Sequence, residues 1–226
     1  MQLAFDTSTD MTSVALVSRD SLILEMTWQC DQNHSVELLP RILYALRSSR
    51  LSLQSIEAIF VAKGPGNYNG LRVGISTAKG LALGLRIPVV GVGTLEIAAY
   101  QYAAGGLPVC SILRAGREQV AFAIYQSKGH KWQKRVSERL ATISELCVQI
   151  TEDTIFCGEY VPTITAELRR SLNQRAIIPV DVNQVRRAYY LAKLGQRQLV
   201  LGNVNDPVTL QPLYLRLPVV TKRKHR

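Results

Sequence analysis

Apolar residues in the first half of the chain recur with spacings that alternate between those of strands and those of helices. Short apolar runs predict strands at residues 2–5, 12–18, 21–28, 56–62 and 88–92. A hairpin turn is expected at Arg19 and Asp20, between the second and third strands. Leucine and isoleucine at helical spacing predict helices over residues 34–49, 71–85 and 94–104. Pro40 falls in the first helix and marks either its true first turn or a kink.

The second half of the chain repeats this order of elements. Strands are expected at residues 109–113, 119–126, 131–136, 154–157 and 176–180, with a turn at Gly129. Helices are expected over residues 142–149, 163–172 and 182–201, the last ended by Gly202. The order β-β-β-α-β-α-β thus occurs twice. We therefore expect an α/β fold of two lobes, residues 1–104 and 105–226, each with a mixed sheet covered by helices.

A glycine-rich loop at residues 63–74 joins the strand at 56–62 to the helix that follows. Its distinctive residues are Gly64, Pro65, Gly66, Gly70 and Arg72. It is not a P-loop, because no Gly-Lys-Ser/Thr opens the helix. The loop alone favours a tight turn without a ligand, and the alternative is a backbone that approaches a partner closely.

The helix after this loop carries a row of small residues. Ser76, Gly80 and Gly84 are four residues apart and share one helical face. Each glycine inside a helix costs about 1 kcal/mol relative to alanine. We therefore expect another backbone to lie against this row, either from the chain's own sheet or from a second subunit. The sequence leaves both alternatives open.

Asp6, Thr7, Ser8 and Thr9 form the turn between the first two strands. A carboxylate and hydroxyls at such a turn are typical of a site for phosphate or for a metal-bound water. The same residue types also form Asx and Ser/Thr turns that bind nothing. Both interpretations stand at this point.

The charge of the chain is concentrated in its second half. The net charge is +10, whereas residues 1–110 hold eight basic and eight acidic residues and are neutral. The chain ends in Lys-Arg-Lys-His-Arg at residues 222–226. A basic half suggests an anionic partner such as nucleic acid, and a solvated basic surface explains it equally well. Aromatic residues make up 7% of the chain, so no stacking platform for single strands is evident.

Hydropathy and cysteine usage favour a cytoplasmic protein. No apolar run is long enough to span a bilayer, and the chain starts directly with a strand-like segment rather than a signal peptide. The four cysteines form no CxxC pair or Cys/His cluster, which favours reduced structural thiols. We expect no membrane association and no cofactor.

Together these features resemble a known family. A duplicated β-β-β-α-β-α unit that opens with Asp-Thr-Ser-Thr looks like the actin/Hsp70/sugar kinase superfamily, which has a ribonuclease H-like fold. The loop and its helix resemble the TsaB (YeaZ) family, as do His34-Ser35 with Leu38-Leu39-Pro40 and the late run Pro-Leu-Tyr-Leu-Arg at 212–216. Family members usually read Gly-Pro-Gly-Ser-Phe-Thr-Gly in the loop. Here Asn67, Tyr68 and Asn69 replace the middle three residues.

This resemblance implies a role in bacterial tRNA modification. The family is a subunit of the machinery that makes N6-threonylcarbamoyladenosine at position 37 of tRNAs that read ANN codons. The resemblance implies a non-catalytic subunit that binds and activates a TsaD-type transferase subunit, with a TsaE-type ATPase acting on that pair. It also implies a homodimer when the subunit is alone. The basic second half would then contact tRNA.

The residues themselves argue against catalysis and metal binding. The turn at 114–118 corresponds to the first-lobe turn but holds one glycine and no aspartate, so it cannot hold magnesium. His34 stands where a metal-binding pair of histidines would begin, yet position 38 is leucine. Family members often read Asp-Ala-Arg-x-x-Glu-Val-Tyr where residues 114–121 read Arg-Ala-Gly-Arg-Glu-Gln-Val-Ala. The rival functions are an ATP-using enzyme of the same fold and a stand-alone RNA-binding protein.

We expect the partner to dock on the helices at 35–49 and 72–85 of the first lobe. Leu39, Leu43 and Leu46 should lie on the exposed side of the first helix, beside the small row of the second. The expected interface residues are His34, Leu39, Leu43, Leu46, Ser76, Gly80 and Gly84.

Overall fold

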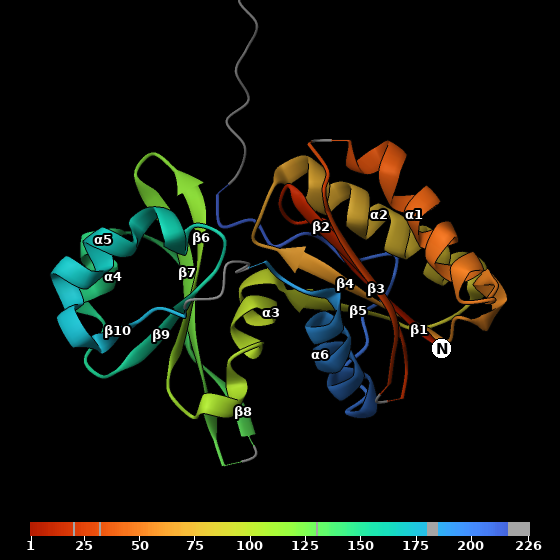
Figure 1. The fold of residues 1–226 in the computed structure, drawn as a ribbon. Coiled ribbons are helices and arrows are strands. Elements are labelled where there is room, and N and C mark those ends of the chain that lie inside the picture. The colour runs from red at the N-terminus through yellow and green to blue at the C-terminus, as the bar shows by residue number, and fades with distance from the viewer. Residues whose placement is uncertain (20, 32, 130, 180–184, 217–226) are drawn as a thin grey trace, which may run out of the picture.

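The computed structural model describes residues 1–19, 21–31, 33–129, 131–179 and 185–216, which form two lobes (Figure 1). The sheet of the first lobe has the strand order β3-β2-β1-β4-β5. Strands β1, β2 and β3 are antiparallel, whereas β1, β4 and β5 are parallel. Helices α1 and α2 lie together on one face of this sheet. The elements are β1 (Gln2–Asp6), β2 (Met11–Ser18), β3 (Ser21–Gln29), α1 (His34–Ser48), β4 (Ala58–Gly64), α2 (Tyr68–Leu85) and β5 (Val89–Gly93), with a short 3-10 helix at Leu53–Ser55.

The second lobe repeats this topology strand for strand. Its sheet has the order β10-β9-β6-β7-β8, with β6, β7 and β8 antiparallel and β6, β9 and β10 parallel. The predicted duplicated α/β fold is therefore confirmed. The elements are β6 (Val109–Gly116), β7 (Gln119–Lys128), β8 (Lys131–Thr142), α4 (Ile143–Val148), β9 (Thr154–Cys157), α5 (Val161–Leu172) and β10 (Ala176–Ile177), with short 3-10 helices at Ala103–Gly105 and Asn173–Arg175.

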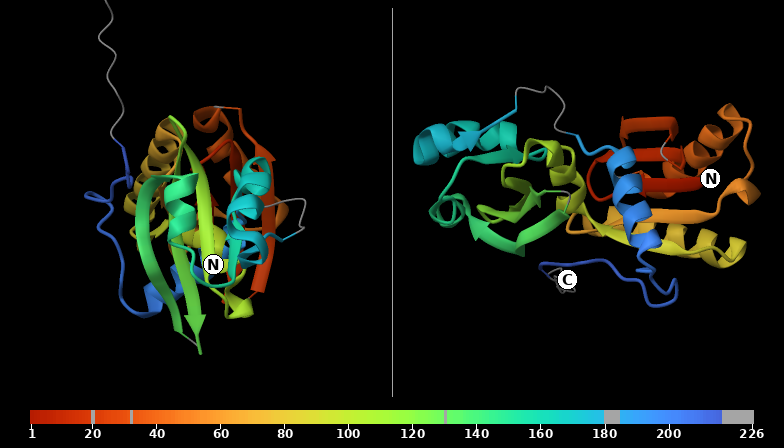
Figure 2. Two further views of the ribbon diagram at one scale, coloured as in Figure 1. Left: turned by 90° about the vertical axis from the view of Figure 1, so that its left-hand side faces the viewer. Right: turned by 90° about the horizontal axis from the view of Figure 1, so that it is seen from below.

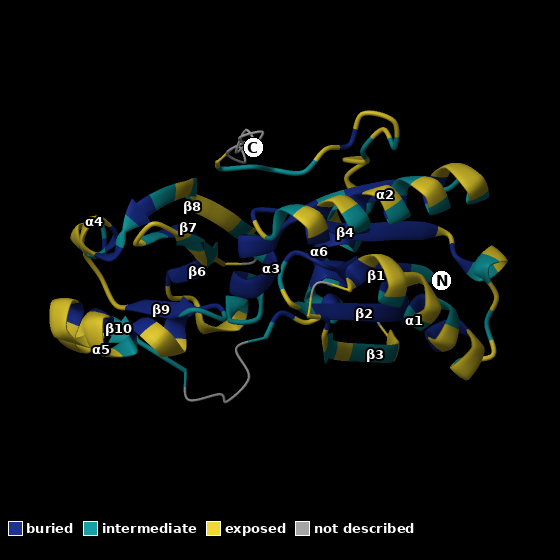
Figure 3. Cartoon of the chain, turned by 90° about the horizontal axis from the view of Figure 1, so that it is seen from above, coloured by how far each residue is buried: buried dark blue, intermediate teal, exposed yellow. Residues whose placement is uncertain are grey.

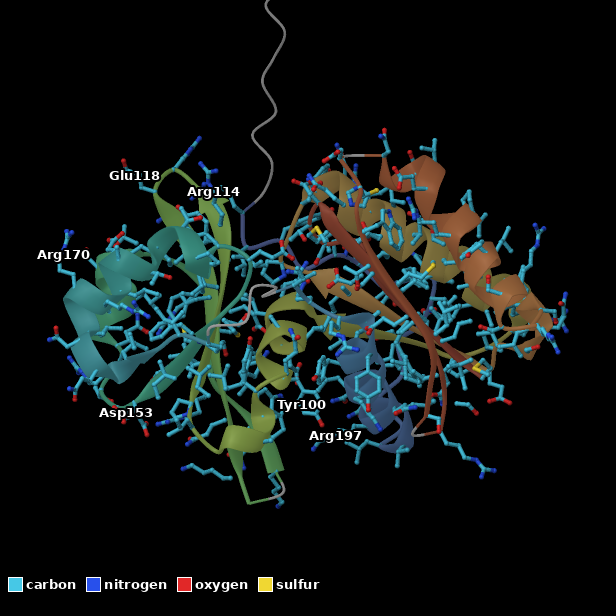
Figure 4. The ribbon with its side chains drawn as sticks, in the orientation of Figure 1. Tyr100, Arg114, Glu118, Asp153, Arg170 and Arg197 are labelled. Atoms are coloured by element: carbon cyan, nitrogen blue, oxygen red, sulfur yellow. The ribbon has the colours of Figure 1, made fainter. Side chains whose placement is uncertain are left out.

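The last helix of each half packs against the sheet of the other half. Helix α3 (Thr94–Tyr100) contacts β6 and β7 of the second sheet, and α6 (Ala188–Val200) contacts β1, β2 and β5 of the first. The two helices meet between the lobes, where Nη1 of Arg197 donates to the hydroxyl of Tyr100 at 3.3 Å (Figure 4). The lobes are thus joined by packed helices as well as by the chain itself.

Both faces of each sheet are covered by apolar side chains. Leu3, Phe5 and Ile59 of the first sheet pack with residues of α1 and α2, and Phe60 faces α6 on the opposite side. Helix α6 crosses so closely that a side-chain carbon at Gly195 would lie 2.3 Å from Phe60. The second sheet has equivalent cores beneath α4 and α5 and beneath α3.

An extended C-terminal segment, residues 203–216, runs from the end of α6 back to the junction between the lobes (Figure 2). We call it the strap. The amide of Asn205 donates to the carbonyl of Val89 at 2.9 Å, and the amide of Leu213 donates to the carbonyl of Lys63 at 2.6 Å. These bonds fasten the strap to β4 and β5 and bring its end beside the glycine-rich loop.

Several element boundaries differ from the sequence predictions. Helix α2 starts at Tyr68 rather than at residue 71, because Oδ1 of Asn67 accepts from the amides of Asn69 and Gly70 at 3.0 and 3.1 Å. Pro40 lies inside α1, so the alternative that Pro40 marks the first turn of this helix is wrong. Strand β8 is longer than predicted, and α3 is shorter. Helix α6 starts at Ala188 and not at 182, whereas Asp20 and residues 180–184 lie outside the described residues.

The cysteines are free thiols. Burial raises the pKa of Cys110 well above its ordinary value and that of Cys157 to about 12, so both thiols stay protonated near neutrality. Among the described residues, no group of three or more His, Cys, Asp or Glu side chains could hold a metal ion. In that same part of the chain, no helix combines the length and hydrophobicity needed to cross a membrane.

Candidate functional site at the junction of the lobes

The turn after β1 is buried at the junction of the lobes. Asp6, Thr7 and Ser8 are at most 1% exposed. Oδ1 of Asp6 accepts from the backbone amide of Ser8 at 2.8 Å and from its hydroxyl at 2.5 Å. The Asp6 carboxylate therefore fixes the turn of its own chain, as an Asx turn does.

A buried arginine from the second half of the chain enters this turn. Arg186 is 1% exposed, and its Nε donates to Oδ2 of Asp6 at 2.8 Å. Its Nη2 donates to the hydroxyls of Thr9 at 2.8 Å and Ser8 at 3.2 Å. Its Nη1 lies 2.9 Å from Oε1 of Glu159. The guanidinium thus forms hydrogen bonds with the oxygen atoms of the turn that a ligand bound at this position would contact.

The same cluster joins the two lobes. Glu159 follows β9 of the second lobe, and its carboxylate also accepts from the hydroxyl of Thr9 at 3.1 Å. Two carboxylates surround one guanidinium, so the cluster carries a formal charge of −1 when all three groups are ionised. Such a charge disfavours an incoming phosphate. The attraction of Asp6 and Glu159 raises the pKa of Arg186 against the opposing effect of its burial, so it stays a cation.

Sequence reasoning missed Arg186. It lies in the stretch predicted as the start of a helix, and no spacing in the sequence links it to Asp6, 180 residues earlier. A pair of adjacent arginines at 186 and 187 was the one available signal, and in most chains such a pair is a solvated charge. Only one of them is solvated here, because Arg187 pairs with Glu25 at the surface while Arg186 points inward.

The glycines of the loop are explained by how closely it packs against this turn. A side-chain carbon at Gly66 would lie 2.1 Å from the carbonyl oxygen of Ser8, and one at Gly70 would lie 2.1 Å from that of Thr7. One at Gly74 would lie 2.2 Å from Oγ1 of Thr7. Glycine is therefore required at these positions by close packing against the backbone of the turn and the side chain of Thr7.

The other loop residues lie at the edge of the strap. Gly64 has a φ of +108°, and a side-chain carbon there would lie 2.6 Å from the carbonyl oxygen of Leu213. Pro65 lines a small cavity together with strap residues. The exposed guanidinium of Arg72 lies over the ring of Tyr68 at 4.5 Å, and that ring contacts Tyr214 at 5.1 Å.

A cleft of about 350 Å³ lies above the turn, between the lobes. Asn67 lines it from the first lobe, and Arg114 and Tyr160 line it from the second. Arg114 lies near the end of β6 and Glu118 lies in the β6–β7 turn, at the top of the second lobe (Figure 4). Arg117 and Glu118 both have positive φ angles, so this turn is tight. Glu118 is its only carboxylate, and it does not line the cleft.

Two of the predicted interface residues are buried inside the first lobe. His34 is 2% exposed, with its Nε2 3.0 Å from the carbonyl oxygen of Thr9, and Leu46 is 2% exposed in the core beneath α1. The expectation that Leu46 lies on the exposed side was wrong, because that turn of α1 faces the sheet. Leu39 is 43% exposed and Leu43 is half-buried, so these two remain accessible.

The small row of α2 faces solvent. Ser76, Gly80 and Gly84 are exposed, and a side-chain carbon at either glycine would meet no neighbouring atom of the described residues within 4 Å. The alternative that this row packs against the chain's own sheet is therefore wrong. Exposed residues recur along α1 and α2, with buried and partly buried residues between them (Figure 3). The exposed large apolar residues on these two helices are Val36, Leu39, Tyr44 and Leu83.

Known proteins similar to this chain agree on one family. The model for the family described as "TsaD: tRNA N6-adenosine threonylcarbamoyltransferase" matches residues 28–211. The tRNA threonylcarbamoyladenosine biosynthesis protein TsaB of Bacillus subtilis is 32% identical over 219 residues, which cover 95% of this chain and 93% of that protein. The protein of the same name from Haemophilus influenzae is 26% identical, covering 98% of this chain and 95% of its own length.

Solved structures give the same result at the level of the fold. YeaZ from Pseudomonas aeruginosa superposes with a TM-score of 0.79 at 25% identity, covering 94% of this chain and 99% of that one. A Pseudomonas aeruginosa protein described as uncharacterized and similar to the peptidase YeaZ gives a TM-score of 0.82 at 26% identity, covering 95% of this chain and 99% of that one. The duplicated topology, the glycine-rich loop packed on its turn and these matches agree, and the chain belongs to the TsaB (YeaZ) family.

Proposed function

We propose that this chain is a non-catalytic subunit of the machinery that makes N6-threonylcarbamoyladenosine in tRNA, and that it binds and activates a TsaD-type transferase subunit. The names of its relatives support a role in this pathway. The match to a TsaD family model supports a partner of similar fold, because two paralogous chains can pack through equivalent helices.

The open row on α2 is the observation that carries this proposal. Ser76, Gly80 and Gly84 present a smooth strip of backbone to solvent, and no contact among the described residues offsets the cost of these glycines in helix stability. Leu39 and Leu83 lie exposed on the same helix pair. A helix of the partner laid along the row would bury these apolar residues at close interaxial distance.

The Asp6–Arg186 pair supports a role without catalysis. An enzyme of this superfamily would need the turn after β1 free to receive phosphate and magnesium. Here an internal guanidinium occupies it, bound by three residues of the turn and by Glu159. The rival function as an ATP-using enzyme requires Arg186 to leave a site in which it is 1% exposed.

We extend the proposal to the other partners as follows. In isolation the chain forms a homodimer through the same α1–α2 face, where a two-fold axis would place the open row of one copy against that of the other. A TsaE-type ATPase acts on the heterodimer. The basic second half adds phosphate contacts when tRNA binds the complex. RNA binding is thus proposed for the complex and not for the chain alone.

Sedimentation velocity with a purified TsaD-type subunit tests the docking face. Gly80→Leu should weaken the heterodimer by roughly tenfold or more, since overpacking costs about 1–3 kcal/mol. Thr163→Leu on α5, the counterpart of α2 in the second lobe, is the matched control and should leave association unchanged. Full assembly of the Gly80→Leu protein would show that the helix pair is not the interface.

A titration with Mg-ATP separates this proposal from the enzymatic alternative. We expect no saturable binding and no turnover by the chain alone. Turnover that persists through purification and is lost in Asp6→Ala would favour the enzyme.

A further inference from the structure

A second cavity, of about 400 Å³, lies at the junction of β5, α3, β8 and α6. It shares no lining residue with the cleft above the Asp6–Thr9 turn. Its charged lining comes from both lobes, with Lys63 and Glu96 from the first half of the chain and Lys134 and Glu138 from β8. Cavities of about 300–1,000 Å³ are the usual size for small-molecule sites.

Two of these four charges neutralise each other. Nζ of Lys134 lies 2.6 Å from Oε1 of Glu138, which also accepts from the hydroxyl of Tyr125 at 3.0 Å. The other two, Lys63 and Glu96, have no ion-pair partner within 4.0 Å among the described residues. The cavity therefore offers one cation and one carboxylate that form no ion pair within 4.0 Å, although the positive charge of Lys63 acts on the Glu96 carboxylate from farther away.

The Glu96 carboxylate is poorly solvated. Its burial raises its pKa, and the positive charge of Lys134, a hydrogen bond from the Trp132 side chain and the positive charge of Lys63 offset only part of that effect. A carboxylate in such a place gains more from a cationic ligand than an exposed one does, because water screens the attraction less.

Two glycines of β5 line the cavity beside these groups. A side-chain carbon at Gly91 would lie 3.1 Å from Cδ of Lys63, and one at Gly93 would lie 3.5 Å from Oε1 of Glu138. The amide of Gly91 donates to Oδ1 of Asn205 at 2.8 Å, which fixes the strap as one wall. Val92 and other apolar residues line the remainder.

We propose that this cavity binds a small zwitterion of the α-amino acid class, whose ammonium group pairs with Glu96 and whose carboxylate pairs with Lys63. The apolar wall receives the side chain of the ligand. A simple anion or a simple amine would satisfy only one of the two free charges. This site is separate from the α1–α2 face, so the test of ligand binding here is independent of the test of partner docking.

Saturation-transfer NMR on the full chain, with each of the twenty standard L-amino acids as the probe, tests this site. At least one amino acid should show saturable binding. Its N-acetyl derivative and its C-terminal amide should each bind about tenfold more weakly or worse, because each lacks one charged group. This comparison is made on the unmodified protein and does not depend on any variant folding.

Two variants locate the binding. Glu96→Gln and Lys63→Met should each lower affinity by a similar factor, whereas Glu118→Gln and Lys128→Met, at exposed positions outside the cavity, should leave it unchanged. Melting curves check that each variant is folded. Absence of binding by all twenty amino acids, equal binding of the blocked derivatives, or binding that survives both cavity variants would overturn the proposal.

Discussion

Nε of Arg186 donates a 2.8 Å hydrogen bond to Oδ2 of Asp6, and each of these side chains is 1% exposed. The pair links the turn after β1 to the segment that enters α6. The guanidinium also reaches Glu159 of the second lobe, so one buried cation fixes the relation of three separate segments. A hinge between the lobes would have to break this cluster and leave charges without partners.

The first prediction concerns this pair. Arg186→Ala should destabilise the chain by about 3–5 kcal/mol, because removing one partner of a buried ion pair leaves the other charged and desolvated. Chemical denaturation followed by circular dichroism measures the loss. Asp6→Asn combined with Arg186→Met should cost less than Arg186→Ala alone, because no uncompensated buried charge remains on Asp6.

Arg187→Ala is the matched control for this experiment. Arg187 is 47% exposed and pairs with Glu25, which is 11% exposed. Because the guanidinium is solvated and Glu25 also accepts from the amide of Tyr189 at 2.9 Å, removal of Arg187 should cost less than removal of Arg186. If the two alanine variants lost equal stability, the buried cluster would not have the role assigned to it.

The second prediction compares two glycines of helix α2. Gly74→Ala should destabilise the fold, because the new carbon would lie 2.2 Å from Oγ1 of Thr7. Gly80→Ala should stabilise the monomer by about 0.5–1 kcal/mol, since alanine is the better helix former and nothing lies within 4 Å. Thermal melts of both variants measure the difference. A destabilising Gly80→Ala would mean that the row is packed within this chain.

The third prediction concerns pH. The pKa of Glu96 is raised above its ordinary value of 4.5 by burial, so the folded chain binds more protons than the unfolded chain between the two pKa values. Stability from this group therefore falls as pH rises through that interval. Glu96→Gln should be more stable than the parent near neutral pH, and the advantage should disappear as pH falls below 4.5. Denaturation midpoints across this range give the test.

Glu145 provides the opposite case. Its pKa is lowered because the backbone amide and the hydroxyl of Thr142 donate to its carboxylate at the start of α4. Stability from Glu145 is present above its ordinary pKa and is lost as pH falls. Glu145→Gln should therefore lose stability near neutral pH, and a gain there would contradict the linkage argument for both residues.

The fourth prediction concerns the basic tail, whose residues 217–226 lie outside the described part of the chain. If the tail contacts tRNA phosphates in the complex, affinity should fall with salt with a log–log slope of about −0.7 to −0.9 per contact. Deleting residues 222–226 should make that slope shallower. Filter binding at several salt concentrations measures it, and an unchanged slope would assign the tail to solubility.

The sequence by itself determined the fold and the family. Apolar periodicity is a local property, so it identified the order of strands and helices in both halves and hence the duplication. The glycine spacing from Gly64 to Gly74 carried the family resemblance for the same reason. Element ends were less well determined. Helix α2 begins at Tyr68 because the Asn67 side chain caps it, and α6 begins only at Ala188.

Tertiary structure alone decided what each of these residues contacts. The sequence left open whether the row at Gly80 faced the sheet or solvent, since helical spacing defines a face but not its direction. His34 and Leu46 are buried, because both lie on the face of α1 that packs against the core. Arg186 reaches Asp6 only because α6 crosses back onto the first sheet. Such a contact depends on how the whole chain packs, which no local spacing encodes.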